Sequence, residues 1–425
     1  MKTGKQSFST HKLIRPALAL AAMSPVVSYA GGISLYEIAT PDVGLASAGY
    51  AARADDASTV FKNPAGMSRL TDAQLQSGAQ LLYADLEFSP NSGTSTSGGD
   101  GGNAVGALPA ASLFVTIPLN EKVTVGFGSC SYFGLALDYD NDWVGRYYVR
   151  NASLIGMSLL PSASYKVNDW LSLGAGLNAM YGMMETKVAV NNPEPSQGDG
   201  SLRIKDEDWG FGGNFGILIM PDERTRIGVT YLSAVCLDFE DKPKFNNLGP
   251  GLGAIFANPN SLDLGMTVPQ QVMVSVYRDL NEKWALMANV GWQDWSAFGK
   301  VDVSVDSSSN PDVTANLNYD DTWHGALGAA YKATAKWTLL GGVAYDTSAV
   351  DDDNRTVTLP MGEAYRFGIG ALYRKSDRFD FGAGFEFIWA GDMEVDQSGT
   401  LRGDVSGEYK NVYFTFFTLN ATWRF

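Results

Sequence analysis

Cysteine and histidine are scarce in this chain of 425 residues, which contains two of each. Cys130 and Cys236 lack the spacing of a metal-binding motif, and we expect them to be unpaired packing residues, with a disulfide as the alternative. Only His324 lies beyond the first segment of the chain, and no Gly-x-Ser-x-Gly, His-Glu-x-x-His or Walker A motif is present. The sequence therefore predicts no enzyme, no catalytic residue, no metal site and no cofactor, and it makes His324 a strand histidine with a polar neighbour.

Basic residues are outnumbered, since 31 Lys and Arg oppose 46 Asp and Glu for a formal net charge of −15. Nucleic-acid backbones are bound by clusters of Lys and Arg, and no such cluster is visible, which excludes a nucleic-acid partner. Long apolar runs are missing as well, because no stretch beyond residue 30 reaches the roughly 18 residues of a transmembrane helix. A membrane-spanning form of this chain has to be a closed β-barrel, since lipid leaves no partner for unpaired backbone groups.

The first 30 residues have the layout of a cleaved export signal. Residues 2–15 carry four cations and no acid, 16–27 is mostly apolar, and Ser28-Tyr29-Ala30 places small residues at the −3 and −1 positions. We expect cleavage after Ala30, with an organelle transit peptide as the alternative. Removal of 1–30 leaves 395 residues and, because four cations leave, shifts the net charge to −19.

Two kinds of side chain alternate along many segments. In 379–390, apolar Phe, Ala and Trp residues take every second position, and small or charged residues take most of the others. The same period recurs in 171–183, in 284–293 and, less regularly, in 337–346. Successive side chains of a strand point to opposite faces, so these segments are strands between two different surroundings. Several exceed the about five or six residues usual in soluble proteins and reach the length of a tilted membrane strand.

Aromatic residues often stand at the ends of the apolar faces, as Trp170, Trp284, Trp337 and Trp389 do. A soluble β-sandwich would alternate too, but it would place its aromatic rings mainly in a shared core. Rings at strand ends are typical of the two membrane interfaces of a barrel. We therefore prefer a transmembrane barrel to a sandwich.

Turns and loops give a strand count. Short polar turns are expected at 120–122, 168–169, 221–225, 281–283, 332–336 and 375–378. Longer loops rich in Gly, Asn, Asp and Pro are expected at 90–105, 137–150, 188–207, 241–266, 305–319, 348–358 and 397–409. Short turns on one side and long loops on the other are typical of outer-membrane barrels. The prediction is an all-β fold, a 14-stranded antiparallel transmembrane β-barrel made by 71–425. The terminal Phe425 resembles the signal read by the outer-membrane assembly machinery.

Residues 31–70 break the alternation and precede the first hairpin. They are rich in Ala, Gly and Asp, and Pro64 disfavours a helix at Asn63. A 14-stranded barrel leaves a lumen wider than its own side chains fill. We therefore expect 31–70 to form a hatch, or plug, inside the lumen, with a periplasmic extension as the alternative.

The segment 49–67 resembles the hatch of the FadL-type outer-membrane transporters of long-chain fatty acids and aromatic hydrocarbons. It contains Asp55, Asp56 and the more specific Asn63-Pro64-Ala65. Further matches lie at Val268-Pro269, in 284–296 and in 337–367, and the resemblance is weakest in 90–266. It implies passive diffusion of hydrophobic molecules, started when a ligand moves the hatch N-terminus. It also implies a kinked third strand that opens the barrel wall, so that substrate leaves sideways into the membrane.

The third strand is expected at about 122–135. Its Gly126, Gly128 and Gly134 are candidates for the lateral opening, because glycine weakens a strand interior, but they fit ordinary lumen-face positions equally well. The spacing alone leaves both interpretations open.

Two groups of residues are candidates for ligand binding. The first is apolar and lies off the strands: Phe61 in the hatch, and Leu252, Ile255 and Phe256 in a loop whose alternative role is packing on its neighbour. The second group consists of cations that face inward by parity, which means that their place in the strand alternation puts them on the inner face. Each could pair with a fatty-acid carboxylate or with a lumen acid such as Glu386; they are Lys166, Arg226 and Arg366.

The expected function is uptake of hydrophobic compounds, foremost long-chain fatty acids, by a monomer in the outer membrane of a Gram-negative cell. The expected partners are a hydrophobic small molecule, outer-membrane lipid and lipopolysaccharide, and the assembly machinery. Uptake of aromatic hydrocarbons is the first alternative. A general porin would not need a hatch, and a surface receptor would hold no ligand in its lumen.

Overall fold

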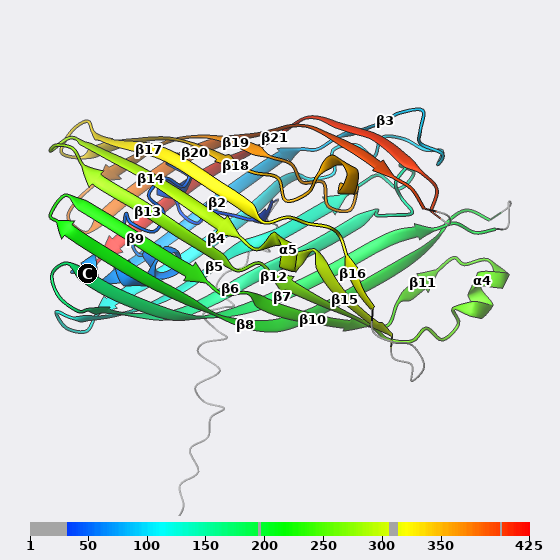
Figure 1. Cartoon of the computed structure of the whole chain (residues 1–425), viewed down its shortest axis with the longest axis horizontal. Coiled ribbons are helices and arrows are strands. Elements are labelled where there is room, and N and C mark those ends of the chain that lie inside the picture. The colour runs from blue at the N-terminus through cyan, green and yellow to red at the C-terminus, as the bar shows by residue number, and fades with distance from the viewer. Residues whose placement is uncertain (1–31, 194–196, 306–312, 400–401) are drawn as a thin grey trace, which may run out of the picture.

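The computed structural model describes residues 32–193, 197–305, 313–399 and 402–425, so the expected export signal lies outside the described residues. The chain forms a closed antiparallel barrel of 14 strands, as the alternation and the turns predict (Figure 1). Strand β21 pairs with β2, with Gln74 opposite Arg424, and this ladder closes the cylinder. The barrel strands are β2 (Gln74–Asp85), β4 (Gly106–Pro118), β5 (Val123–Asp138), β6 (Asn151–Lys166), β7 (Leu171–Val190), β8 (Gly200–Asp222), β9 (Thr225–Leu232), β13 (Gln271–Asp279), β14 (Trp284–Gln293), β17 (Thr322–Lys332), β18 (Trp337–Asp346), β19 (Ala364–Arg374), β20 (Phe379–Gln397) and β21 (Val405–Arg424).

All six expected short turns connect consecutive barrel strands at the end where the C-terminus lies, and the long loops leave the other end (Figure 1). Two loop predictions are wrong in extent. Strands β7 and β8 pair up to Val190 opposite Gly200, so most of 188–207 is strand. Strands β20 and β21 likewise pair up to Gln397 opposite Val405. The hydrogen-bonded ladder continues beyond the membrane although the apolar alternation stops there.

Other predicted loops contain structure of their own. A separate four-stranded sheet combines parts of 235–316 in the order β10-β12-β15-β16. The short elements outside the barrel strands are β3 (Phe88–Pro90), β10 (Val235–Asp241), β11 (Lys244–Asn246), α4 (Pro250–Ile255), β12 (Leu262–Val268), α5 (Trp295–Phe298), β15 (Lys300–Val305), β16 (Val313–Asn316) and η2 (Asp352–Asn354). The predicted loops 241–266 and 305–319 are therefore partly folded.

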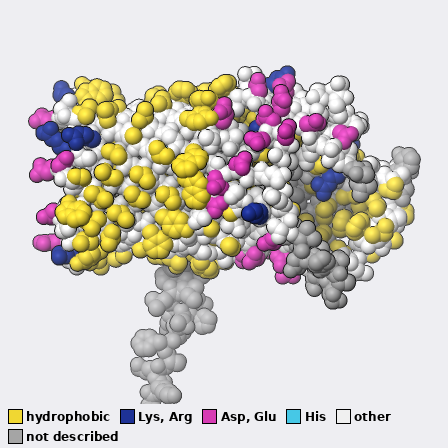
Figure 2. All heavy atoms as spheres, in the orientation of Figure 1, with side chains coloured by type: hydrophobic (Ala, Val, Ile, Leu, Met, Phe, Trp, Pro, Cys, Tyr) yellow, Lys and Arg dark blue, Asp and Glu magenta, His cyan; other side chains and the backbone are white. Residues whose placement is uncertain are grey.

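The outer wall of the barrel is apolar, and the inner wall is small or polar. Along β7, Leu173 and Leu177 are exposed while Ser172 and Asn178 are fully buried. Apolar side chains cover the barrel from the short-turn end to about its middle, and charged side chains border this region on both sides (Figure 2). The exposed apolar residues contact lipid instead of water, because a membrane is the solvent that stabilises such a surface.

Aromatic pairs mark both borders of the apolar wall, as the sequence predicts. At the short-turn end, the rings of Trp284 and Tyr331 lie 4.5 Å apart, centre to centre, on neighbouring strands. At the other end, Tyr365 and Trp389 lie 5.9 Å apart. Such rings combine an apolar body with a polar tip and suit the interface between lipid and water.

The segment before the barrel lies inside it. It comprises β1 (Gly32–Ser34), α2 (Thr40–Gly44), α3 (Thr59–Lys62) and η1 (Pro64–Arg69), drawn in blue within the barrel in Figure 1. The helix α2 contacts β18 to β21, and η1 contacts β5 to β8 on the opposite wall. Within the described residues, no helix combines the length and apolar character needed to span a membrane. We call residues 32–70 the hatch.

Candidate ligand cavity and hatch

Glycines on the inner wall receive the backbone of the hatch. A Cβ atom at Gly342 would lie 1.9 Å from the carbonyl oxygen of Leu45, and one at Gly174 would lie 2.1 Å from the backbone nitrogen of Ala65. No side chain fits in such a space. Similarly close backbone approaches occur at Gly228 and Gly368, and Gly216 leaves room for the side-chain oxygen of Asn63. The alternating glycines of the inner wall thus form a seat for the hatch.

The Asn63-Pro64-Ala65 motif anchors one end of that seat. The Asn63 side-chain amide donates to the carbonyl oxygens of Ala51 (2.7 Å) and Ile217 (3.0 Å). Its side-chain oxygen accepts from the backbone N–H of Ala65 at 3.1 Å, which caps the turn that Pro64 begins. The motif therefore links two hatch segments to strand β8.

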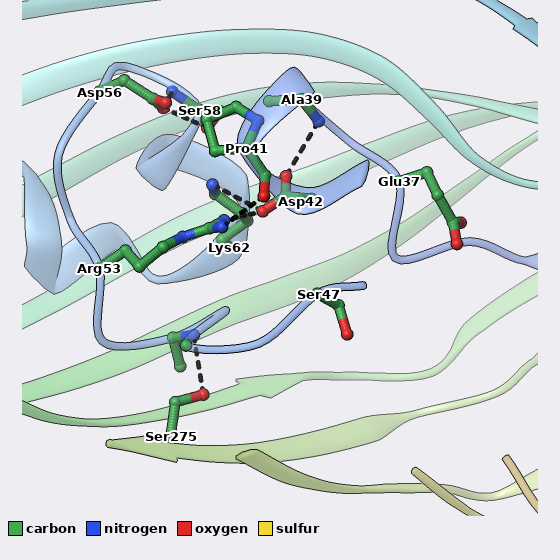
Figure 3. A network of polar contacts seen from close by, with 12 residues as sticks. Glu37, Ala39, Pro41, Asp42, Ser47, Arg53, Asp56, Ser58, Lys62 and Ser275 are labelled. Atoms are coloured by element: carbon green, nitrogen blue, oxygen red, sulfur yellow. Dashed lines mark hydrogen bonds and ion pairs between the residues drawn. The ribbon is translucent and has the colours of Figure 1, made fainter. Parts of the chain in front are cut away.

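An ion cluster holds the other half of the hatch together. The buried Asp42 accepts hydrogen bonds from Arg53 and, at 3.0 Å, from the Lys62 ammonium (Figure 3). The two adjacent acids of the 49–67 segment, Asp55 and Asp56, make other contacts. Asp56 accepts from the backbone N–H of Ser58 at 3.0 Å, and Asp55 lies 3.3 Å from Arg226 of β9.

A partly open, mostly apolar cavity of about 170 Å³ lies between the hatch and the half of the barrel wall nearer the long loops. Its polar end contains Tyr36, Asp346 and Arg366, together with Gln293 and Thr322. Its apolar wall comes from loops and strands on several sides of the barrel, namely from Leu35, Leu86, Val105, Leu135, Leu359, Met361, Ile388, Met393, Phe414 and Phe416. This lining, apolar with one polar end, matches the chemical character of an amphiphile with an apolar chain and a polar head.

Arg366 lies among three carboxylates at the polar end. It is buried and hydrogen-bonded to Glu37 of the hatch and to Asp346 of β18. Glu386 of β20 lies 3.8 Å from the same guanidinium, and neither of its oxygens has a hydrogen-bond partner among the described residues. One cation thus serves three acids, the buried Glu37 and Glu386 and the partly exposed Asp346, and only Glu37 belongs to the hatch.

His324 joins this cluster to a second hatch residue. Its Nδ1 lies 2.6 Å from Asp346, and its Nε2 lies 2.6 Å from the Ser47 hydroxyl. The order Ser–His–Asp resembles a hydrolase triad, but Ser47 is 2% exposed. The backbone N–H groups of Ser47 and Ala48 both donate within the hatch, so neither is free to stabilise an oxyanion. The arrangement attaches the hatch to β17, and the polar neighbours expected for His324 are Ser47 and Asp346.

The other predicted cations lie elsewhere. Lys166 is at the short-turn end of β6 and pairs with Asp169 at 2.8 Å, and this hydrogen bond lowers the pKa of the Asp169 carboxyl. Arg226 also lies near the short turns, beside Asp55, and does not line the apolar cavity. Of the three, the structure brings only Arg366 to the cavity. Parity assigns the face of a strand but not the depth of a residue along the barrel.

The apolar candidates are also separated. Phe61 is buried in the hatch, where its ring lies 4.9 Å from that of Tyr132, and it does not line the cavity. Leu252, Ile255 and Phe256 belong to or follow α4, far out in a loop (Figure 1). Ile255 is 71% exposed, and the Phe256 ring packs on Phe245 at 4.6 Å.

The third barrel strand, β5, separates from β4 part of the way along. Their ladder runs from Pro118 opposite Thr124 to Leu113 opposite Ser129, and no described pairing continues it up to Gly106 and Asp138. The backbone N–H of Asp138 then donates to Ala104 at 2.7 Å. This leaves a window in the wall between residues 105–112 and 130–137.

Hatch strand β1 lies in this window. It pairs with β5, with Gly32 opposite Gly134 and Ser34 opposite Phe133, while the other edge of β5 pairs with β6. The register of β5 shifts between Ser131 and Phe133, so the irregularity lies at Tyr132 and not at a glycine. Gly126 and Gly128 lie below the window, where they contact Val60 of the hatch.

Both cysteines are free, as expected, but only Cys130 is a buried packing residue, because Cys236 is exposed on β10.

Sequence reasoning missed Glu37 and Tyr36. The available signal was a single acid within the otherwise uncharged segment 31–41, at the start of the predicted hatch.

The closed barrel, the internal hatch and the apolar cavity together define an outer-membrane transport protein. The chain belongs to the outer membrane protein transport protein family (OMPP1/FadL/TodX), whose family model matches residues 20–425. The family comprises outer-membrane transporters of hydrophobic compounds and not enzymes.

Several proteins resemble the chain over nearly its full length. It is 29% identical to Outer membrane protein P1 of Haemophilus influenzae, covering 93% of each chain. It is 26% identical to the Long-chain fatty acid transport protein of Escherichia coli K12, covering 90% of this chain and 93% of that protein. A solved Pseudomonas aeruginosa FadL homologue has a TM-score of 0.84 at 23% identity, covering 92% and 99%. The Pseudomonas putida toluene transporter TodX has a TM-score of 0.67 at 14% identity, covering 94% and 99%. At these low identities, the two structural similarities concern the fold alone.

Proposed function

We propose that this protein takes up long-chain fatty acids through the outer membrane by ligand-gated passive diffusion, with exit sideways through the barrel wall. The observation that carries the proposal is Arg366 at the polar end of an apolar cavity. An aromatic hydrocarbon needs only the apolar part, whereas a fatty acid uses the arginine as well. The similarity to a relative named as a long-chain fatty acid transport protein supports the same substrate class.

Gating follows from the shared arginine. A fatty-acid carboxylate that entered as a fourth acid would be repelled by Glu37, Asp346 and Glu386. Replacing Glu37 keeps the charge of the cluster constant and preserves a charge-assisted hydrogen bond to Arg366. The ligand therefore competes with the hatch for one cation, and its binding releases Glu37.

Release of Glu37 loosens the strand that occupies the window. Glu37 follows β1 by three residues, and the backbone N–H of Leu35 donates to Tyr132 of β5 at 2.8 Å. When Glu37 leaves Arg366, this end of the hatch is held at the wall by the short β1 ladder and by single hydrogen bonds from Gln293 to Ser34 (3.0 Å) and from Gln80 to the Glu37 carbonyl oxygen (2.5 Å). Leu135 and Val105 border both the window and the cavity, so the ligand has an apolar path between them.

Uptake measurements separate the candidate functions. Proteoliposomes or cells with the protein should take up oleate at least several-fold faster than protein-free controls, with saturation, and should show no large steady conductance for ions. Faster uptake of toluene but not of oleate would favour the aromatic-hydrocarbon alternative. A large steady conductance would favour a general porin, and no uptake of either compound would favour a surface receptor.

A disulfide at the window tests the exit route. Ser112 would be the next rung after Leu113 opposite Ser129, which places it opposite the native Cys130. Oxidised Ser112→Cys should therefore join β4 to β5 at the lower edge of the window and lower oleate uptake by roughly fivefold, because the window can no longer widen. Reduction should restore uptake, and Ser112→Cys combined with Cys130→Ser is the control. Full uptake by the cross-linked protein would show that lateral exit is wrong.

A further inference from the structure

A second cavity, of about 570 Å³, lies beneath the hatch at the short-turn end. Nine Lys and Arg residues line it, against four Asp, whereas acids outnumber bases in the whole chain. The cations come from both parts of the protein: Arg53, Lys62 and Arg69 from the hatch, and the others from the ends of barrel strands and the turns between them. We call this cavity the basic vestibule.

Arg226 has hydrogen-bonding capacity that the protein does not use. Its side chain is 7% exposed, and its guanidinium lies 3.6 Å above the ring of Tyr277. Nη1 is 3.3 Å from Asp55, but Nε and Nη2 have no hydrogen-bond partner among the described residues. A buried charged donor without an acceptor is costly, so the site favours an additional acceptor.

The neighbouring cations also outnumber the carboxylates that form ion pairs with them. Arg53 and Lys62 share the single carboxylate of Asp42 (Figure 3). Arg69 is exposed and has no ion pair among the described residues, and partial desolvation together with the nearby Arg226 lowers the pKa of its guanidinium. Two arginines that repel each other across a cavity are stabilised when an anion binds between them.

We propose that the basic vestibule binds a phosphate-bearing anion, with Arg226 and Arg69 as its principal ligands. Guanidinium groups match phosphate oxygens in pairs, and the excess of cations suits a multiply charged anion better than a monocarboxylate. The anion bridges the hatch and the barrel, because Arg69 belongs to the first and Arg226 to the second. This site is separate from the apolar cavity and does not depend on the transported substrate.

Calorimetric titration of the mature protein in phosphatidylcholine nanodiscs with pyrophosphate, at constant ionic strength, tests the proposal. The wild type should bind saturably, and the double variant Arg69→Gln, Arg226→Gln should bind about tenfold or more weakly. The matched control is Arg278→Gln, an exposed arginine on the same strand as Tyr277 that does not line the vestibule; it should bind as the wild type does. Arg69→Gln alone, at an exposed position, should weaken binding severalfold without any risk to the buried contacts of Arg226.

Nanodiscs of a second lipid composition show whether the phosphate belongs to a lipid headgroup or to a soluble anion. If phosphatidylglycerol nanodiscs weaken pyrophosphate binding to the wild type but not to the double variant, lipid headgroups occupy the site. If the lipid makes no difference, the site takes a soluble phosphate anion. Absence of saturable binding, or equal affinity of the double variant and Arg278→Gln, would overturn the proposal.

Discussion

Gly342→Val is expected to convert the closed protein into a steadily conducting pore. A Cβ atom at this position would lie 1.9 Å from the Leu45 carbonyl oxygen and 2.2 Å from its carbon. These are backbone atoms, which cannot rotate aside as the end of a flexible side chain can. The hatch must therefore leave its seat, while the barrel ladder on either side of β18 stays intact. Conductance in planar bilayers should rise about tenfold or more, because packed protein no longer fills the lumen.

The control for this experiment is the adjacent residue on the same strand. A Cβ atom at Gly341 meets nothing within 4 Å, since this residue faces outward from the barrel. Valine is favoured in strands, so Gly341→Val should assemble normally and conduct as little as the wild type. Both variants should keep the same β-sheet circular-dichroism spectrum. Equal conductance of Gly342→Val and the wild type would contradict the seat formed by the inner-wall glycines.

The barrel could be predicted from the sequence because lipid and lumen impose different side chains on alternate positions. The run 379–389 and the six short turns give the strand directions and their number directly. Outside the membrane that constraint disappears. Strands β7, β8, β20 and β21 extend into predicted loops through backbone hydrogen bonds, which leave no periodic signal in the side chains.

The candidate site could be predicted only in part. Parity correctly turned Arg366 inward, and the hatch motif correctly identified the segment inside the barrel. Parity could not distinguish the depth of Arg366 from that of Lys166 or Arg226. Glu37 could not be assigned a partner, because the hatch has no period and its contacts with Arg366 join residues more than three hundred positions apart.

Glu37→Gln is expected to tighten oleate binding about tenfold, which corresponds to about 1.4 kcal/mol. A neutral amide competes less well than a carboxylate for the Arg366 guanidinium, so the ligand displaces it more easily. Oleyl alcohol has the same chain without the carboxylate, and its affinity should stay nearly unchanged. Fluorescence titration of both compounds with the purified mature protein measures the difference. Glu363→Gln is the control, because Glu363 accepts a hydrogen bond from Tyr345 outside the cavity.

Replacing Arg366 instead of Glu37 distinguishes competition between ligand and hatch carboxylates from a general loosening of the hatch. Arg366→Gln removes the cation from three acids, two of them buried, and loss of one partner of a buried ion pair costs about 3–5 kcal/mol. The hatch is thereby loosened in both variants, but oleate binding changes in opposite directions only if its carboxylate replaces Glu37 on Arg366. Arg366→Gln should thus weaken oleate strongly and oleyl alcohol little. If Glu37→Gln instead leaves oleate affinity unchanged, or alters both ligands equally, then the hatch carboxylate does not compete with the substrate and gating has another trigger.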